Sequence, residues 1–297
     1  MLRNGLYFVA SEAVKSAESP LARAYRASLI LGSLREDVIA LPLLGFTEYP
    51  SFSHFGGVGL PGGYLPLLWP GPRSSVARLY RRALVAARRG RVAAAFVALG
   101  RAAHVLSDVS IPSHAQRAAH ERDPFEWWIE GNLAMLRGAE SSVVAPSPRE
   151  PADLVRSLAT HAARFAADRT TTPLGRMLKR AGHYRAVRAA EAREQALELI
   201  PDAVSHVRAL LDSACRAMLE HGGGSSALVS SQPMRDEDVL EETLDALDLP
   251  ERMLKPWFDH NRAFCDQHGG RRVYPGLLEL LDRCDAALAK RARGAGK

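Results

Sequence analysis

The sequence predicts an all-α protein built as a multi-helix bundle. Apolar residues recur at intervals of three and four along almost the whole chain. No pair of apolar runs shows strand alternation closed by a hairpin turn. Only 7% of the residues are aromatic, which suits a helical core better than a β-sandwich. The 297 residues, 47% of them hydrophobic, are enough to bury a large core and exclude disorder of the whole chain.

The first domain follows from this helical spacing. Helices are expected over 7–16 and 21–31, and after a break over 75–89, 91–109, 124–136, 153–167 and 185–221. Pro201 is expected to break or kink the last of them, because proline lacks the amide hydrogen that a helix interior needs. Residues 1–222 are therefore predicted to form one helical domain.

Three stretches are predicted to be irregular. Residues 45–72 and 138–151 carry clustered glycines, prolines or polar residues, which are typical of loops that cover a site or lie exposed. The segment 223–233 is rich in glycine and serine and predicts a linker. Beyond it, helices are expected near 237–247, 250–267 and 275–293, so residues 234–297 are predicted to form a small helical C-terminal appendage.

The predicted helix 75–89 is amphipathic and strongly basic. Five arginines share a stripe about 120° wide on this helix: Arg78, Arg81, Arg82, Arg88 and Arg89. The simplest interpretation is a solvated face. The alternative, consistent with the net charge of +6, is a surface that contacts an anionic membrane or nucleic acid through Arg78, Arg82 and Arg89.

The cysteine count restricts the kind of metal site that the chain can build. Cys215, Cys265 and Cys284 are too few and too widely spaced for a four-cysteine zinc site or a disulfide framework. Any metal ion must therefore be held by histidine and carboxylate side chains.

The predicted helix 91–109 carries the first candidate ligands. It is apolar nearly all round and is expected to be buried. His104 and Asp108 are four residues apart and therefore share one face of it. A buried imidazole and carboxylate are costly unless they pair with each other or bind a cation, and zinc accepts such nitrogen and oxygen ligands.

Further candidate ligands follow this helix. Pro112 ends or bends it, which can turn His114 back toward the same cavity. Asp123 and Pro124 are typical of an N-cap and a first helical residue, so Glu126 is expected in the first turn of the next helix. Each residue alone has an ordinary structural explanation. Taken together, their spacing is equally compatible with a metal site and with a hydrogen-bonded core.

This segment resembles the zinc-dependent phospholipase C family, whose all-α fold is shared with single-strand-specific zinc nucleases. Five residues stand in the order of the family pattern: His104, Asp108, Pro112, His114 and Glu126. Upstream, the run from Gly32 to Asp37 resembles the family's Gly-x4-Asp element, and Ser53-His54-Phe55 resembles its His-Phe element. The resemblance covers a third of the chain.

The resemblance implies a zinc-dependent phosphodiester hydrolase with two zinc ions. Asp37, His54, His104 and Asp108 would hold the first ion, and His114, His120 and Glu126 the second. Asp37 would also be the general base, and zinc would lower the pKa of an attacking water to about 7. The implied substrate is a phospholipid or another phosphodiester. A single-strand nuclease and a catalytically inactive zinc-bound helical protein stay open as alternatives.

Two departures from the family pattern affect the metal set. The family's middle histidine on the second zinc lies four residues before the glutamate, where this sequence has Arg122, and His120 is the nearest substitute. The family's third zinc uses the N-terminal amine and carbonyl of a tryptophan and an early histidine. Here no tryptophan precedes Trp69 and no histidine precedes His54. The third site is therefore expected to be absent, altered or encoded upstream.

Targeting signals are not apparent in the sequence. Ser11 and Glu12 interrupt the short apolar stretch near the start, and no uninterrupted apolar run approaches about 18 residues. The chain is therefore expected to have no transmembrane segment. It is expected to be cytoplasmic as written, or secreted if its true N-terminus lies upstream.

Overall fold

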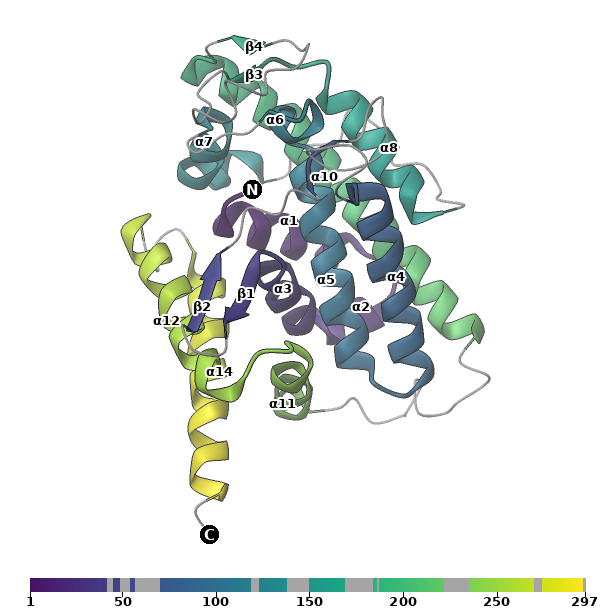
Figure 1. The fold of residues 1–297 in the computed structure, drawn as a ribbon, viewed down its shortest axis with the longest axis vertical. Helices are drawn as coiled ribbons and strands as arrows, with labels where there is room; N and C mark the ends of the chain where they lie inside the picture. Colours follow the sequence, from purple (N-terminus) through teal and green to yellow (C-terminus); the bar gives the residue numbers. More distant parts are fainter. Residues whose placement is uncertain are drawn as a thin grey trace.

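The chain folds as an all-α multi-helix bundle, as the sequence predicts (Figure 1). The structure is a computed structural model. It describes residues 1–41, 45–48, 54–56, 70–118, 123–137, 150–168, 184–185, 187–221, 235–269 and 274–295. The predicted linker 223–233 lies outside the described residues.

The helices follow this order along the chain. They are α1 (Arg3–Ser16), α2 (Pro20–Ala24), α3 (Arg26–Arg35), α4 (Pro72–Arg88), α5 (Val92–Val109), α6 (Pro112–Ala115), α7 (Pro124–Asn132), the 3-10 helix η2 (Leu133–Leu136), α8 (Pro151–Ala162), α10 (Ala189–His221), α11 (Asp236–Ala246), α12 (Glu251–Gln267) and α14 (Pro275–Ala295).

Two short strand pairs accompany the helices. Strands β1 (Val38–Leu41) and β2 (Gly45–Glu48) pair antiparallel, and β3 (Ala167–Asp168) and β4 (Tyr184–Arg185) pair parallel. The sequence predicts no β-hairpin, and the antiparallel pair of β1 and β2 shows that this prediction is wrong. The irregular stretch predicted from residue 45 is also wrong over Gly45–Glu48, which form β2. Four-residue strands are too short to show the alternation on which that expectation depended.

Three predicted helices differ in detail from the observed ones. The predicted helix 21–31 is two helices, α2 and α3, separated at Tyr25. The predicted helix 153–167 ends at Ala162. Helix α10 continues through Pro201 instead of breaking there. Helix α10 packs against α1, α5 and α7, and the burial of Leu199, Ile200 and Ala203 around Pro201 outweighs the missing backbone hydrogen bond.

Helix α5 is the central element of the bundle and is nearly surrounded by α3, α4, α8, α10 and α11. Its 18 residues are long and apolar enough to cross a membrane by length and composition, and it is the one such helix in the described part of the chain. However, 89% of that stretch is buried inside the protein, as expected of a core helix.

Helices α3 and α5 approach each other closely because each presents a glycine at their contact. A Cβ atom at Gly32 would collide with the carbonyl oxygen of Val97, and one at Gly100 with the carbonyl oxygen of Leu29. Only hydrogen atoms fit between the two backbones at these points. This approach brings the C-terminal end of α3 against the face of α5 that carries His104.

The three C-terminal helices share the hydrophobic core of the first 222 residues. Ser28 on α3 and Thr243 on α11 are hydrogen-bonded through their hydroxyl groups at 2.7 Å. The guanidinium of Arg35 donates to the carbonyl oxygen of Leu247 at 2.9 Å. The hydroxyl of Tyr274 donates to the carbonyl oxygen of Glu130 on α7. The C-terminal helices therefore buttress α3 and α7, which flank the candidate site.

Helix α1 is capped by a residue from another helix. No side chain at its own N-cap accepts a hydrogen bond from its first turn. Instead, Oε1 of Glu130 accepts from the backbone N–H groups of Asn4 and Gly5, both at 3.1 Å. These are two of the donors that a helix start leaves unsatisfied. Glu130 thereby fixes the start of α1 beside α7.

Candidate metal centre

Four predicted ligands come together at one end of the bundle. One ligand atom from each of Asp37, His54, His104 and Asp108 lies within 4.8 Å of the other three. Asp37 follows α3, His54 lies in the segment between β2 and α4, and the other two residues lie on α5. Residues far apart in the sequence therefore build one group, which could hold a metal ion.

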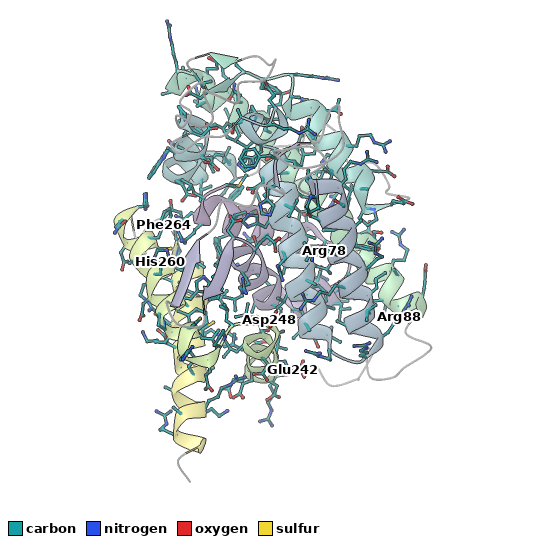
Figure 2. All side chains as sticks on the ribbon, viewed as in Figure 1. Arg78, Arg88, Glu242, Asp248, His260 and Phe264 are labelled. Atoms are coloured by element: carbon teal, nitrogen blue, oxygen red, sulfur yellow. The ribbon has the colours of Figure 1, made fainter. Side chains whose placement is uncertain are left out.

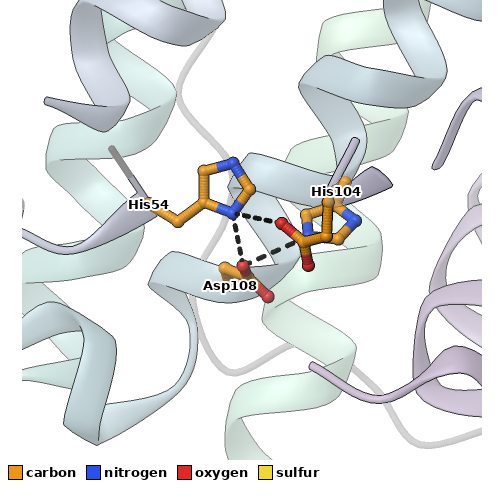
Figure 3. A group of neighbouring side chains, drawn as sticks. His54, His104 and Asp108 are labelled. Atoms are coloured by element: carbon orange, nitrogen blue, oxygen red, sulfur yellow. Dashed lines mark hydrogen bonds and ion pairs between the residues drawn. The ribbon is translucent and has the colours of Figure 1, made fainter. Parts of the chain in front are cut away.

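The interatomic distances describe a compact cluster (Figure 3). Nδ1 of His54 is 2.8 Å from Oδ2 of Asp108 and 3.6 Å from Oδ1 of Asp37. Nε2 of His104 is 3.1 Å from Oδ2 of Asp37 and 3.3 Å from Oδ2 of Asp108. A tetrahedral zinc ion with bonds of 2.0–2.2 Å separates its ligand atoms by roughly 3.3–3.6 Å. The spacing is therefore close to what one ion requires.

The cluster also leaves polar atoms without protein partners. Within the described part of the chain, Oδ1 of Asp37 and Nε2 of His104 are buried and make no hydrogen bond, although both have polar neighbours. Buried polar atoms are normally hydrogen-bonded, so exceptions need an explanation. A metal ion among these atoms would satisfy them, and the donor set fits such an ion.

His104 is oriented by helix α3. Its Nδ1 atom lies 2.7 Å from the carbonyl oxygen of Ser33. A carbonyl oxygen can only accept, so Nδ1 carries the hydrogen and donates it. Nε2 is then the ring atom that faces Asp37 and Asp108. Metal-binding histidines commonly donate their second nitrogen to a carbonyl or carboxylate in this way.

The charges in the cluster stabilise one another. Burial opposes the protonation of His54, but the neighbouring carboxylates of Asp108 and Glu36 outweigh it and raise the pKa of His54 to about 9. The pKa of His104 is also raised, because Asp37 and Asp108 outweigh its burial. The pKa of Asp108 is lowered despite burial by the N-terminal ammonium and His104. Without a metal ion, the positive charges of protonated imidazoles would offset the negative charges of the carboxylates. A metal ion that binds here must therefore displace protons from the imidazoles.

Glu36 joins the cluster from outside the predicted set. Its Oε1 lies 3.6 Å from Nε2 of His54, and its Oε2 accepts from Nε of Arg101. Burial raises the pKa of Glu36, but His54 and Arg101 outweigh it and lower that pKa to about 2. Glu36 therefore orients His54 from the side opposite Asp108.

Asp37 is the most accessible of the four ligands. Its side chain is 34% exposed, whereas those of His54, His104 and Asp108 are 1–2% exposed. A substrate would therefore approach the cluster from the side of Asp37.

His114 returns to the cluster as its sequence predicts. Pro112 begins α6, and Nδ1 of His114 lies 3.8 Å from Oδ2 of Asp108. The ring of Phe55 stacks on that of His114 with centroids 4.3 Å apart, and the N–H of Gly56 donates to the carbonyl oxygen of His114 at 2.8 Å. The segment that carries His54 is thereby tied to α6.

Glu126 lies in the first turn of α7, as predicted. Asp123 caps this helix by accepting from the N–H of Phe125 at 2.9 Å. Oε1 of Glu126 lies 2.9 Å from the N-terminal amine of Met1, which also pairs with Oδ1 of Asp108. Burial opposes the charge on this amine, but both carboxylates outweigh burial and raise its pKa to about 11. The single positive charge of this ammonium group is therefore shared between Asp108 and Glu126.

Of the three ligands predicted for a second zinc ion, the structure describes only His114 and Glu126. His120 lies outside the described residues. Among the residues that the structure describes, the one group of metal-binding side chains that can share an ion is Asp37, His54, His104 and Asp108. His114 and Glu126 flank this group but do not belong to it.

A second buried polar cluster was not predicted from the sequence. Nδ1 of His161 on α8 lies 2.6 Å from Oδ2 of Asp202, and its Nε2 lies 2.9 Å from Oε1 of Glu198, both on α10. No acid shares the helix face of His161, so the sequence around it does not indicate an ion pair. Its partners lie on another helix, so only the packing of α8 on α10 reveals them.

Comparison with known proteins finds no match: no family model, no curated protein and no solved structure matches this chain.

Proposed function

We propose that the chain is a zinc-dependent phosphodiester hydrolase of the phospholipase C type. One observation carries the proposal: Asp37, His54, His104 and Asp108 form a buried group whose ligand atoms lie within 4.8 Å of one another. Their sequence order is that of the resemblance described above. Zinc is the preferred ion because two imidazoles and two carboxylates with near-tetrahedral spacing suit it.

The bound zinc would supply a water of lowered pKa and a positive charge beside the attacked phosphoryl group. The protein's own residues have separate tasks. Asp37, the exposed member of the cluster, accepts the proton of the attacking water. Ser33 and Glu36 orient the two imidazoles through His104 Nδ1 and His54 Nε2. The buried surroundings keep these charges poorly solvated and their interactions strong.

A second candidate is a catalytically inactive protein with one structural zinc ion. Burial favours it, because the side chains of His54, His104 and Asp108 are only 1–2% exposed, as in a closed structural site. Such a site would hold one ion and stabilise the junction of α3 and α5. It predicts a large loss of thermal stability with a chelator and no turnover of any phosphodiester.

The test compares metal content and hydrolysis in the same preparations. The substrates are a chromogenic phosphocholine ester and single-stranded DNA, and the variants are Asp37→Asn and Asp238→Asn. Asp238 lies exposed on α11, far from the cluster in sequence, and controls for loss of one carboxylate charge. We expect the wild type and Asp238→Asn to hydrolyse one of the substrates and Asp37→Asn to lose at least about a hundredfold in rate.

The two substrates separate the proposed activities. Cleavage of the phosphocholine ester supports the phospholipase-like activity, whereas degradation of DNA supports the nuclease. A zinc-loaded protein that cleaves neither substrate, and melts much lower with a chelator, supports the structural candidate. Equal activity of Asp37→Asn and the wild type would overturn the role of Asp37.

A further inference from the structure

A pocket with a volume of about 300 Å³ lies between α4, the N-terminal half of α5 and the end of α11. Its polar lining consists of Arg82, Arg89, Arg91, Arg101, Asp245 and Asp248, and its remaining walls are alanine and valine. Figure 2 labels Arg78 and Arg88 on α4, and Asp248 beside the lower half of α5. His104 and Asp108 lie farther along α5, toward its C-terminal end. The pocket is thus distinct from the metal cluster.

Three of the four arginines have no acidic partner among the residues that the structure describes. Arg82, Arg89 and Arg91 are exposed, and none of them forms an ion pair or side-chain hydrogen bond within the described ranges. The carboxylate of Asp245 is already bonded to Arg291 at 2.8 Å. The acidic residues in the lining therefore leave an excess of positive charge in the pocket.

A fifth arginine lies close to the pocket and strengthens its positive field. Arg35 is buried, and its guanidinium donates to the carbonyl oxygens of Leu247 and Asp248 at 2.9 and 3.2 Å. Burial lowers the pKa of Arg35 and the charge of Arg101 lowers it further, while Asp248 and Glu36 offset only part of this shift. Backbone carbonyls satisfy its hydrogen bonds without cancelling its charge. The pocket thus keeps like charges close together, an arrangement that an anion would relieve.

Arg101 is held in place before any ligand binds. Its Nε donates to Glu36, and its side chain is 19% exposed. An arginine fixed in this way loses less side-chain entropy when it binds an anion. The guanidinium fork matches the oxygen atoms of a phosphate group.

We propose that this pocket binds a small polyphosphate or a headgroup that carries adjacent phosphates. The concave shape favours a compact ligand over a flat surface, and a volume of about 300 Å³ lies at the lower end of the range for small-molecule sites. Arg82 on α4, together with Arg89 and Arg91 at the turn between α4 and α5, can contact two phosphates at once. The proposal involves none of the metal ligands, and within the described residues the lining contacts the cluster only through Arg101 and Glu36.

The test uses inorganic pyrophosphate as the probe, titrated by calorimetry into the metal-loaded protein. The double variant Arg82→Gln/Arg89→Gln removes two lining arginines. Its matched control, Arg81→Gln/Arg88→Gln, removes the same charge from the adjacent exposed positions of α4, which do not line the pocket. We expect the first variant to weaken binding about tenfold or more and the control to change it less than about threefold.

Two further experiments establish whether pyrophosphate binds in the pocket and whether the natural ligand is a lipid headgroup or a free polyphosphate. Because pyrophosphate can also bind a metal ion, the titration is repeated with His104→Ala, which should keep the affinity. Vesicles of phosphatidylcholine with phosphatidylinositol bisphosphate test a headgroup as the source: binding that pyrophosphate displaces identifies a lipid, and no vesicle binding identifies a free polyphosphate. Three results would overturn the proposal: no binding by the wild type, equal loss in the control, or loss in His104→Ala alone.

Discussion

Nδ1 of His104 lies 2.7 Å from the carbonyl oxygen of Ser33, so a backbone group of α3 sets the orientation of a ligand on α5. This contact exists because the two helices meet at glycines. It turns Nε2 toward Asp37 and Asp108 before any metal binds. The fold therefore builds the cluster from the packing of α3 on α5.

The glycine contact gives the first prediction. Gly100→Ala would place a methyl group against the carbonyl oxygen of Leu29, which is backbone and must shift. We expect a loss of about 1–3 kcal/mol in the free energy of unfolding, with weaker metal binding because Ser33 moves away from His104. Chemical denaturation and a competitive zinc titration measure the two effects.

Gly131→Ala is the matched control for this substitution. Nothing lies within 4 Å of a Cβ atom at Gly131, which is exposed on α7. The same chemical change should therefore stabilise the protein by about 0.4–1 kcal/mol. If Gly100→Ala were as stable as the wild type, the close approach of α3 and α5 would be wrong.

The sequence predicts local relationships well and relationships between helices poorly. The pair His104 and Asp108 follows from spacing on one helix, and the return of His114 follows from Pro112. Neither the contact of Glu36 with His54 nor that of His161 with Asp202 has a local signal. These contacts depend on how helices lie against each other, which hydrophobic periodicity does not specify.

The same limit explains the errors in the predicted fold. Strands β1 and β2 are four residues each, too short for a pattern, and their pairing is a contact between segments. The position of Met1 depends on Glu130, which caps α1 from α7. Glu130 is 126 residues from Asn4 in the sequence and gives no sign of this role before the fold is known.

The raised pKa of His54 predicts how the metal-free protein responds to pH. The pKa of His54 rises from 6.5 to about 9 on folding, so its stabilising contribution is complete below about pH 6.5 and is lost as pH rises through 9. We expect the free energy of unfolding of the chelated protein to fall by up to about 3 kcal/mol over this range. Denaturation at a series of pH values measures it.

His54→Gln separates this contribution from the others. The variant should show a smaller decline in stability over the same pH range, since Gln does not titrate. His104 remains and contributes in the same direction, because its pKa is raised as well. A chelated wild type whose stability is flat from pH 6.5 to 9 would contradict the ion-paired cluster.

The raised pKa of Glu130 predicts that the free energy of unfolding also depends on pH, over a lower pH range than for His54. Burial raises the pKa of Glu130 to about 7, although hydrogen bonds from Gly5 and Asn4 lower it. The neutral form is favoured on folding, so this contribution is present below about pH 4.5 and is lost as pH rises through 7, by up to about 3 kcal/mol. Glu130→Gln keeps a carbonyl acceptor for α1 and should flatten the profile. An unchanged profile in this variant would refute the assignment.

The cluster around His161 predicts that substitutions of its two acidic partners, Asp202 and Glu198, reduce stability by different amounts. Asp202→Asn removes a fully buried charge that pairs with His161, and we expect a loss of about 3 kcal/mol in stability. Glu198→Gln removes a partner whose side chain is 41% exposed and should cost less than about 1 kcal/mol. Thermal and chemical denaturation of both variants compare them. Equal losses would show that burial does not govern this cluster.

The most direct test of the account is the zinc content of the purified protein, measured by mass spectrometry under native conditions beside His104→Ala. The account predicts at least one tightly bound zinc ion per wild-type chain and its loss in a folded His104→Ala variant. A folded wild-type protein that binds no zinc when the ion is supplied would contradict it. Asp37, His54, His104 and Asp108 would then be an ion-paired core, and the proposed hydrolase would have no basis.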